Sequence, residues 1–149
     1  MQNEDRFKMF AATYLVLIKN GQVLLHKRNE NSYQGGNYGL VSGHFDGDET
    51  TKDCIIREVL EEADITINPE DLKIVHVMHR KASDREYFDV FVMAEKWTGE
   101  ILNMEPNKCD SLDWYRLNEL PENMVPEVKF ALESFQKGLF YSDFGWPQQ

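Results

Sequence analysis

The sequence predicts a single domain of the mixed α/β class, in which a β-sheet packs in layers with helices. Short apolar, partly β-branched runs typical of strands stand on both sides of a segment with helical periodicity, and a second helical segment follows. The 149 residues, 42% of them hydrophobic, are enough for one sizeable core. Residues 1–149 are therefore expected to form one unit, without repeats or linkers.

Six strand-like runs are expected in chain order. The first two are joined by Lys19-Asn20-Gly21, and Asn-Gly is the strongest short signal for a hairpin. The third is short and bounded by glycines, and the fourth and fifth form another pair. The expected strands are residues 11–18, 22–28, 38–42, 72–80, 87–97 and 111–116.

Helical periodicity appears twice. The first helix is expected over residues 51–63, and residues 50–53 supply a capping box at its start. The second is expected over residues 126–137, with apolar residues at three- and four-residue spacing and Gly138 as its stop. The apolar stripe of the first helix consists of Ile55, Ile56, Val59 and Ala63.

Charge and hydropathy exclude several classes of function. A net charge of −10 and a pI of about 4.8 repel the phosphate backbone of DNA or RNA, so polymeric nucleic acid is not an expected partner. No run approaches the roughly 18 apolar residues of a membrane span, and residues 1–10 do not resemble a signal peptide. We expect a cytoplasmic protein whose Cys54 and Cys109 are buried and unpaired.

The most informative feature is a cluster of acids on the first expected helix. Glu58, Glu61 and Glu62 stand at positions i, i+3 and i+4, which places three carboxylates on one face opposite the apolar stripe. Only Arg57 lies adjacent in sequence, so the mutual repulsion favours cations, and Mg²⁺ prefers such hard oxygen ligands. Taken alone, these residues are more often plain solvated surface.

The wider pattern decides between these two interpretations. A Gly is followed after five residues by Glu, after seven more by Arg-Glu, and then by an apolar residue, any residue and Glu-Glu. Six such matches have a chance probability of about one in ten million per starting position. The segment resembles the Nudix box, the motif of the Nudix hydrolase family. The matching residues are Gly43, Glu49, Arg57, Glu58, Glu61 and Glu62.

Two departures from the box concern the backbone. Asp64 stands where the family usually has Gly after the helix, and Asp is among the few other residues that enter the left-handed region at modest cost. Val41-Ser42-Gly43 replaces the Pro-Gly-Gly of many members but keeps the glycine adjoining the site. Neither departure removes a carboxylate.

The resemblance implies a fold, a cofactor and a set of roles. The implied fold is an α/β/α sandwich with a mixed sheet between helices, and the implied cofactor is Mg²⁺ or Mn²⁺. Arg57 is expected to orient the ligands, pointing away from Glu61 and Glu62, with a loss of about 10–100-fold on removal. Glu49 is expected to brace the loop before the helix. The implied metal ligands are Gly43, Glu58, Glu61 and Glu62, and the implied catalytic residues are Glu58, Glu62, Arg57 and Glu105.

Signals for the substrate pocket are weaker. Arg28, close to the glycine-rich entry to the site, is the preferred phosphate-binding residue, whereas Lys27, Arg80 and Arg85 are expected to be solvated. Tyr33 and Tyr38 are candidates for stacking on a base.

Other side chains are expected to be structural. Trp114 is assigned to the core, and His76 and His79 are expected to be structural because residues three apart on a strand face opposite sides. Residues 140–146 form an aromatic tail that should pack on the domain or on a partner in a homodimer.

Three functions remain open at this point. The first is hydrolysis of a nucleoside triphosphate to a monophosphate and pyrophosphate, as in proteins similar to MutT. The second, within the same family, is cleavage of a nucleotide sugar or a dinucleotide polyphosphate. The third is a catalytically silent module that binds a nucleotide, although such a module would be expected to lose box carboxylates.

Overall fold

The structure, a computed structural model, describes residues 5–147. Residues 1–4, which belong to the opening segment considered above, lie outside this range, as do residues 148–149. No helix among the described residues combines the length and apolar character needed to cross a membrane. The elements are β1 (Phe10–Lys19), β2 (Gln22–Arg28), β3 (Tyr38–Gly39), β4 (Ser42–His44), α1 (Thr51–Ala63), η1 (Pro69–Asp71), β5 (Lys73–Lys81), β6 (Glu86–Ala94), β7 (Cys109–Arg116), α2 (Pro126–Gln136) and β8 (Tyr141–Phe144).

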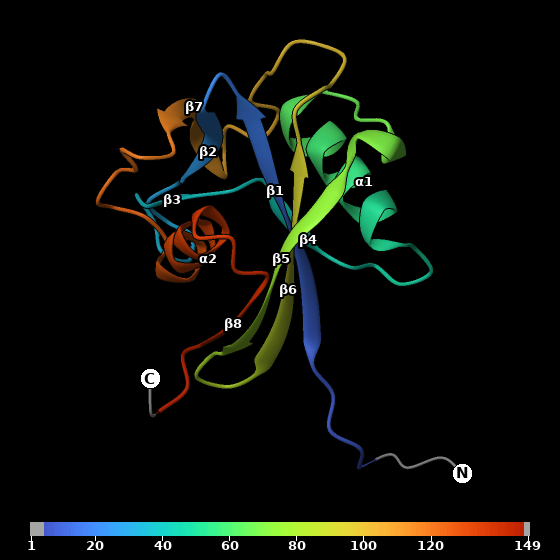
Figure 1. Cartoon of the computed structure of the whole chain (residues 1–149), viewed down its shortest axis with the longest axis vertical. Helices are drawn as coiled ribbons and strands as arrows, with labels where there is room; N and C mark the ends of the chain where they lie inside the picture. Colours follow the sequence, from blue (N-terminus) through green and yellow to red (C-terminus); the bar gives the residue numbers. More distant parts are fainter. Residues whose placement is uncertain (1–4, 148–149) are drawn as a thin grey trace.

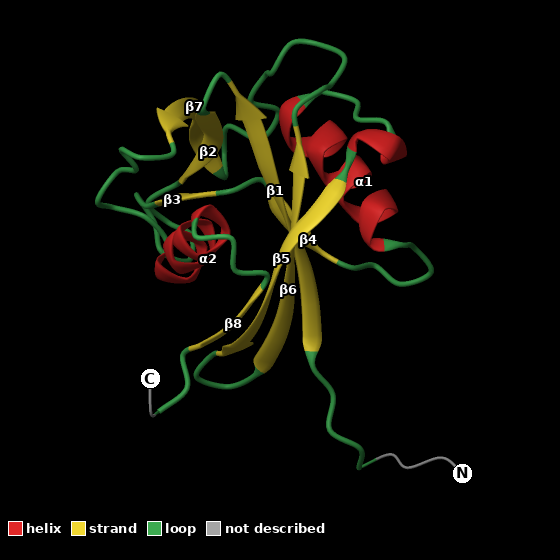
Figure 2. Cartoon of the chain, in the orientation of Figure 1, coloured by secondary structure: helices red, strands yellow, loops and turns green. Residues whose placement is uncertain are grey.

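The strands form one mixed sheet of eight, with two helices on opposite sides (Figures 1 and 2). The main order is β3-β2-β1-β6-β5-β8, with β4 added to β1 and β7 added to β2. β1 and β6 run parallel, as do β5 and β8, and the remaining pairs are antiparallel. This arrangement confirms the α/β/α sandwich that the box implied.

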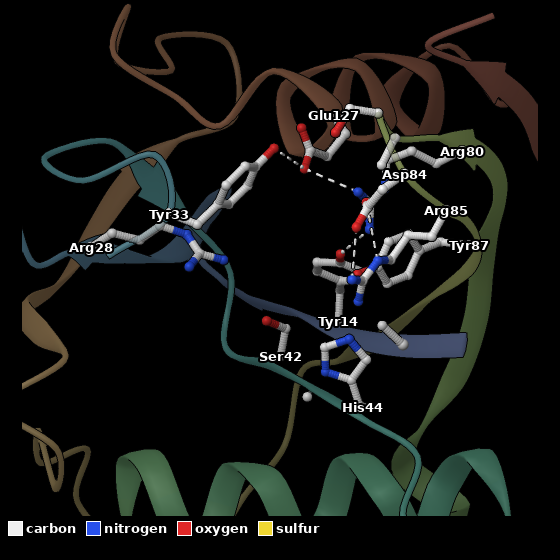
Figure 3. Close-up of a pocket in the computed structure, with 14 residues that line it drawn as sticks. Tyr14, Arg28, Tyr33, Ser42, His44, Arg80, Asp84, Arg85, Tyr87 and Glu127 are labelled. Atoms are coloured by element: carbon white, nitrogen blue, oxygen red, sulfur yellow. Dashed lines mark hydrogen bonds and ion pairs between the residues drawn. The ribbon is translucent and has the colours of Figure 1, made fainter. Parts of the chain in front are cut away.

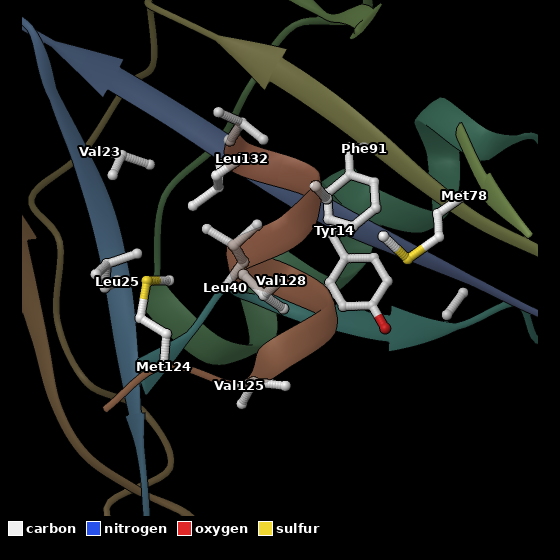
Figure 4. Close-up of a cluster of buried hydrophobic side chains, with 13 residues drawn as sticks. Tyr14, Val23, Leu25, Leu40, Met78, Phe91, Met124, Val125, Val128 and Leu132 are labelled. Carbon is white, nitrogen blue, oxygen red and sulfur yellow. The ribbon is translucent and has the colours of Figure 1, made fainter. Parts of the chain in front are cut away.

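β1 shows why both faces of the sheet are covered. Its side chains alternate, so Leu15 and Leu17 join the core cluster that contains α1, while Tyr14 and Val16 join the cluster that contains α2. Figure 4 shows the second cluster, in which Val128 and Leu132 of α2 pack toward the sheet. A strand that is apolar on both faces requires a helical layer on each side.

Most predicted elements are confirmed, one is corrected, and one strand was not predicted. The Asn20-Gly21 hairpin has φ of 53° and 75°, the left-handed values that Asn-Gly favours in such turns. The single strand expected over 38–42 is two strands, β3 and β4, because the chain crosses from β2 to β1 between them. The aromatic tail packs on the domain as the strand β8, which the sequence did not predict; a homodimer stays a prediction.

Helix α1 begins and ends at the residues that the sequence indicated. The Thr50 hydroxyl accepts a hydrogen bond from the Asp53 amide at 3.0 Å, and the Asp53 carboxylate accepts one from the Thr50 amide at 3.4 Å. Asp64 has φ of 59° and its amide donates to the Leu60 carbonyl, which closes the helix without glycine. The helix therefore has fixed ends, so its acidic face has a defined position.

An ion pair joins β5 and β6 inside the protein. The Arg80 guanidinium donates to both carboxylate oxygens of Asp89, at 2.6 and 3.2 Å, and lies over the Tyr87 ring at 4.0 Å from its centroid. Asp89 is 0% exposed and Arg80 is 8% exposed. Arg80 is therefore not the solvated side chain that the sequence suggested, because the carboxylate beside it on the sheet compensates its charge.

Removing one member of this pair should destabilise the fold. Asp89→Ala removes two hydrogen bonds of the buried Arg80 and leaves it the longer, 3.5 Å contact with Glu127 as its ion pair, so we expect the unfolding free energy to fall by about 3 kcal/mol. The exposed pair of Asp84 and Arg85 in the adjoining hairpin supplies the control, and Asp84→Ala should cost less than about 1 kcal/mol. Urea unfolding of both variants measures the difference, and equal losses would contradict this account.

Candidate active site

The glycine of the box lies where strand β4 meets helix α1. Gly43 pairs with Thr13 of β1, and its Cα faces the Glu58 side chain so closely that a Cβ at this position would collide with the Glu58 carboxyl group. Any larger residue would push Glu58 out of its place. The close approach explains why this position requires glycine, although its backbone is not in the left-handed region.

Arg57 braces the loop before α1 against the helix. Its guanidinium donates to both oxygens of Glu49, at 3.2 and 3.0 Å, and to Glu58 at 2.8 Å. Glu49 also accepts the Asp46 amide at 2.7 Å, and hydrogen bonding from Arg57 lowers the pKa of Glu49 to about 2. Glu49 thus has the bracing contacts expected of it.

The expected direction of Arg57 needs a correction. Its Nη1 lies 3.7 Å from Glu61 Oε1, so it does not point away from that residue. The two residues are four apart, which puts them on the same side of the helix. Arg57 consequently stabilises the positions of two box acids as well as the loop.

Three of the box acids, Glu58, Glu61 and Glu62, line one cavity of about 380 Å³ on the surface of α1. Burial raises the pKa of Glu62 to about 9, with further contributions from hydrogen bonding and charge of Glu58 and from the charges of Glu105 and Glu61. Four carboxylates therefore interact electrostatically in this cavity. Three of them lie on α1, and the fourth, Glu105, comes from the loop between β6 and β7. The cavity is lined by His26, Arg28, Ser32, Leu40, Ser42, Glu58, Glu61, Glu62, Glu105 and Lys108.

These residues fit divalent cations. Carboxylate oxygens are hard ligands, and burial together with the neighbouring acids raises the pKa of Glu62, so a cation that offsets their charge would favour the ionised cluster. Among residues 5–147 no group of three or more His, Cys, Asp or Glu side chains is already arranged around a common point for a metal ion. Mg²⁺ needs few protein ligands, because it keeps water ligands and shares its coordination sphere with substrate phosphates.

A second cavity of about 540 Å³ adjoins the first, and the two share Arg28 and Ser42 (Figure 3). Its size lies within the usual range of small-molecule sites, and tyrosine rings form part of its wall. It is lined by Ala12, Tyr14, Arg28, Tyr33, Ser42, Gly43, His44, Arg80, Ala82, Ser83, Asp84, Arg85, Tyr87 and Glu127.

Arg28 stands at the junction of the two cavities. Its guanidinium lies over the Tyr33 ring, 5.7 Å from the centroid. Its Nε is buried and has no hydrogen-bond partner within the described part of the chain. A buried donor without a partner is uncommon. The residue itself lines both cavities, so its guanidinium is placed to donate to an anionic oxygen of a ligand.

The other two predicted substrate residues, Tyr33 and Tyr38, lie in different surroundings. Tyr33 lines the larger cavity and is 60% exposed, and its hydroxyl donates to Glu127 at 3.3 Å. Tyr38 lines neither of the two cavities; its ring lies edge-on to Tyr115, and its hydroxyl accepts a hydrogen bond from Tyr115 at 2.9 Å. Tyr38 is therefore placed for packing.

The residues expected to be structural are so placed. Both ring nitrogens of His76 are within hydrogen-bond distance of residues near β8, and His79 Nε2 lies 2.9 Å from Glu86. Trp114 packs on Trp97 outside the two cavities. Cys54 and Cys109 are buried and free.

Sequence reasoning missed several residues that line these cavities. Glu127 begins α2, far from the box in sequence, and no local pattern marked it. His26 could have been found, because it follows Leu24 on the strand face that turns toward α1. The polar residues missed include His26, Ser32, Ser42, His44, Asp84, Lys108 and Glu127.

Solved structures show the same fold. The MutT NUDIX hydrolase from Burkholderia pseudomallei has a TM-score of 0.78 and 24% identity, covering 85% of this chain and 98% of that one. The MutT protein from Methanosarcina mazei has a TM-score of 0.74 and 20% identity, covering 87% of this chain and 94% of that one. At these identities the similarity concerns the fold.

Sequence comparisons identify the family. The NAD-capped RNA hydrolase NudC of Pectobacterium carotovorum is 25% identical over 83% of this chain and 45% of the relative. NudC of Photorhabdus laumondii is 25% identical over 80% and 44% respectively, so the chain spans less than half the length of these curated relatives. The family model of the NUDIX domain matches residues 9–135, well over half of the sequence. The chain therefore belongs to the NUDIX domain family.

Proposed function

We propose that this protein hydrolyses a nucleoside triphosphate to a monophosphate and pyrophosphate in the cytoplasm, with Mg²⁺ or Mn²⁺ as the cofactor. The observation that carries the proposal is the junction of two cavities at Arg28 and Ser42. One cavity carries the acids suited to divalent cations, and the other has the size and aromatic wall suited to a nucleoside. A substrate spanning both would lie with its phosphate chain along the box.

The carboxylates would hold the cations, with Glu58, Glu61 and Glu62 as the protein ligands and the Gly43 carbonyl beside them. When bound, divalent cations withdraw charge from phosphoryl oxygens and acidify the attacking water. Arg57 holds Glu58 in place through its 2.8 Å contact, and the Arg28 guanidinium orients a phosphoryl oxygen at the junction. Water attacks phosphorus, the bridging P–O bond breaks, and the acids accept the proton that the water loses.

The residues that line the carboxylate cavity favour a triphosphate as the substrate and not a molecule with two nucleosides. Ser32 and Lys108 line this cavity, and its described lining contains no tyrosine, phenylalanine or tryptophan for a second base. Lys108 lies 3.8 Å from Glu105, which places a cation beside the acids where terminal phosphates would extend.

The second candidate is a dinucleotide, as the names of the NudC relatives suggest. A nucleotide sugar is a further alternative within the family. A panel of triphosphates, NAD⁺ and nucleotide sugars separates these substrates by their products.

Glu62→Gln should reduce hydrolysis of the best substrate in this panel by at least about a hundredfold, since it removes an anionic group while keeping the side-chain volume. The measurement is phosphate or pyrophosphate release with Mg²⁺ present. Glu70→Gln, at an exposed position in η1, is the matched control and should keep wild-type activity. Full activity in Glu62→Gln would exclude the catalytic assignment and favour a nucleotide-binding module.

Stability should depend on pH in a direction set by Glu62. Its folded pKa of about 9 lies above the ordinary 4.5, so between these values the folded state keeps a proton that the unfolded chain loses. In EDTA, the contribution of Glu62 to the unfolding free energy should therefore be most favourable below pH about 4.5. It should decrease steadily as the pH rises from there to about 9. Mg²⁺ should offset the loss, because it stabilises the ionised cluster.

Urea unfolding at several pH values tests this expectation. The decline from pH about 5.5 to about 8.5 should be steeper in wild type than in Glu62→Gln, which lacks the titrating group. Parallel curves for the two proteins would show that Glu62 does not keep its proton.

A further inference from the structure

A buried group of charges closes the end of the larger cavity that is distant from the box. Arg80 pairs with the fully buried Asp89 through two hydrogen bonds, and its Nη1 lies 3.5 Å from Glu127 Oε2. Glu127 is 6% exposed and lies in the cavity wall at the start of α2 (Figure 3). The group contains one cation and two carboxylates, so it carries an excess negative charge.

The remaining charges near this wall do not remove the excess. Arg85 is paired with Asp84 at 2.8 Å and its guanidinium lies over the Phe10 ring. Arg28, at the junction of the cavities, lies over the ring of Tyr33, whose hydroxyl contacts Glu127. The cavity therefore has a cation at the junction and an excess of carboxylate charge around Glu127, beyond the Tyr33 hydroxyl.

Glu127 also has unused capacity to accept hydrogen bonds. Its contacts with Tyr33 at 3.3 Å and Arg80 at 3.5 Å are longer than the 2.7–2.9 Å that is usual for hydrogen bonds to charged groups. Both contacts use Oε2, and within the described residues Oε1 accepts no hydrogen bond from another side chain. Because an ionised carboxylate offers about four acceptor sites, the wall is suited to a ligand rich in donors.

We propose that Glu127 is a specificity-determining residue that selects a guanine base by accepting its imino and amino N–H groups. The inference rests on the proposed function, which places the nucleoside in this cavity and the phosphates at Arg28. Guanine presents two adjacent donors, whereas adenine and cytosine present one amino group and uracil one imino group. Arg80, fixed by Asp89, presents a donor beside Glu127 to the guanine carbonyl oxygen.

Equilibrium binding of GMP and IMP in EDTA tests this assignment without requiring turnover. The two ligands differ by the 2-amino group, so wild type should bind GMP about tenfold more tightly than IMP. In Glu127→Gln the ratio of the GMP and IMP affinities should fall to within about twofold. The amide nitrogen of Gln is a hydrogen-bond donor, so it faces a donor N–H of guanine and cannot accept from it. Glu133→Gln, on the exposed face of α2, is the matched control and should keep the wild-type ratio.

The outcomes separate this inference from the proposed function. Equal affinity of wild type for GMP and IMP would overturn the assignment of Glu127 whether or not its variant folds, as would an unchanged ratio in a folded Glu127→Gln. Hydrolysis that still depends on Glu62 would leave the proposed reaction standing in either case. Conversely, a GMP preference lost in Glu127→Gln supports the assignment even if no triphosphate is cleaved.

Discussion

Electrostatic repulsion among four acids is the constraint on which the candidate site depends. Glu58, Glu61 and Glu62 occupy little more than one turn of α1, and Glu105 approaches them from a loop. Burial, together with these neighbouring acids, raises the pKa of Glu62 to about 9. Such an arrangement costs stability unless protons or cations compensate it. In a member of the NUDIX domain family, a function at the cluster explains this arrangement, since an acidic helix face that is only solvated would not need a fourth acid from a distant loop.

The rest of the fold holds this cluster beside a nucleoside-sized cavity. β1 carries both core layers and pairs with β4, which brings Gly43 against Glu58. The same strand contributes Tyr14 to the wall of the larger cavity, so one strand determines the relative position of the two cavities. Charged groups are distributed along the two cavities. The acids of the box line the first cavity, Arg28 stands at the junction, and the buried group of Arg80, Asp89 and Glu127 lies at the second cavity.

The sequence predicted what depends on local periodicity or on a spaced motif. Both helices, the Asn-Gly hairpin, the cap at Thr50 and the left-handed Asp64 were of this kind, and so were the acids of the box. Contacts between distant segments could not be predicted: β8 pairs with β5 only because α2 returns the chain there, and Glu127 meets Arg80 across separate elements. Arg80 was misjudged for the same reason, because its partner Asp89 lies on the neighbouring strand.

The central claim is that divalent cations compensate the acids of α1 where a substrate's phosphate chain lies. Anomalous diffraction from crystals grown with Mn²⁺ and a non-hydrolysable triphosphate tests it most directly. The account predicts Mn²⁺ peaks at coordination distance, about 2.0–2.4 Å, from carboxylate oxygens of Glu58, Glu61 or Glu62, with phosphate oxygens completing the sphere. A bound nucleotide with no Mn²⁺ at these residues would contradict it.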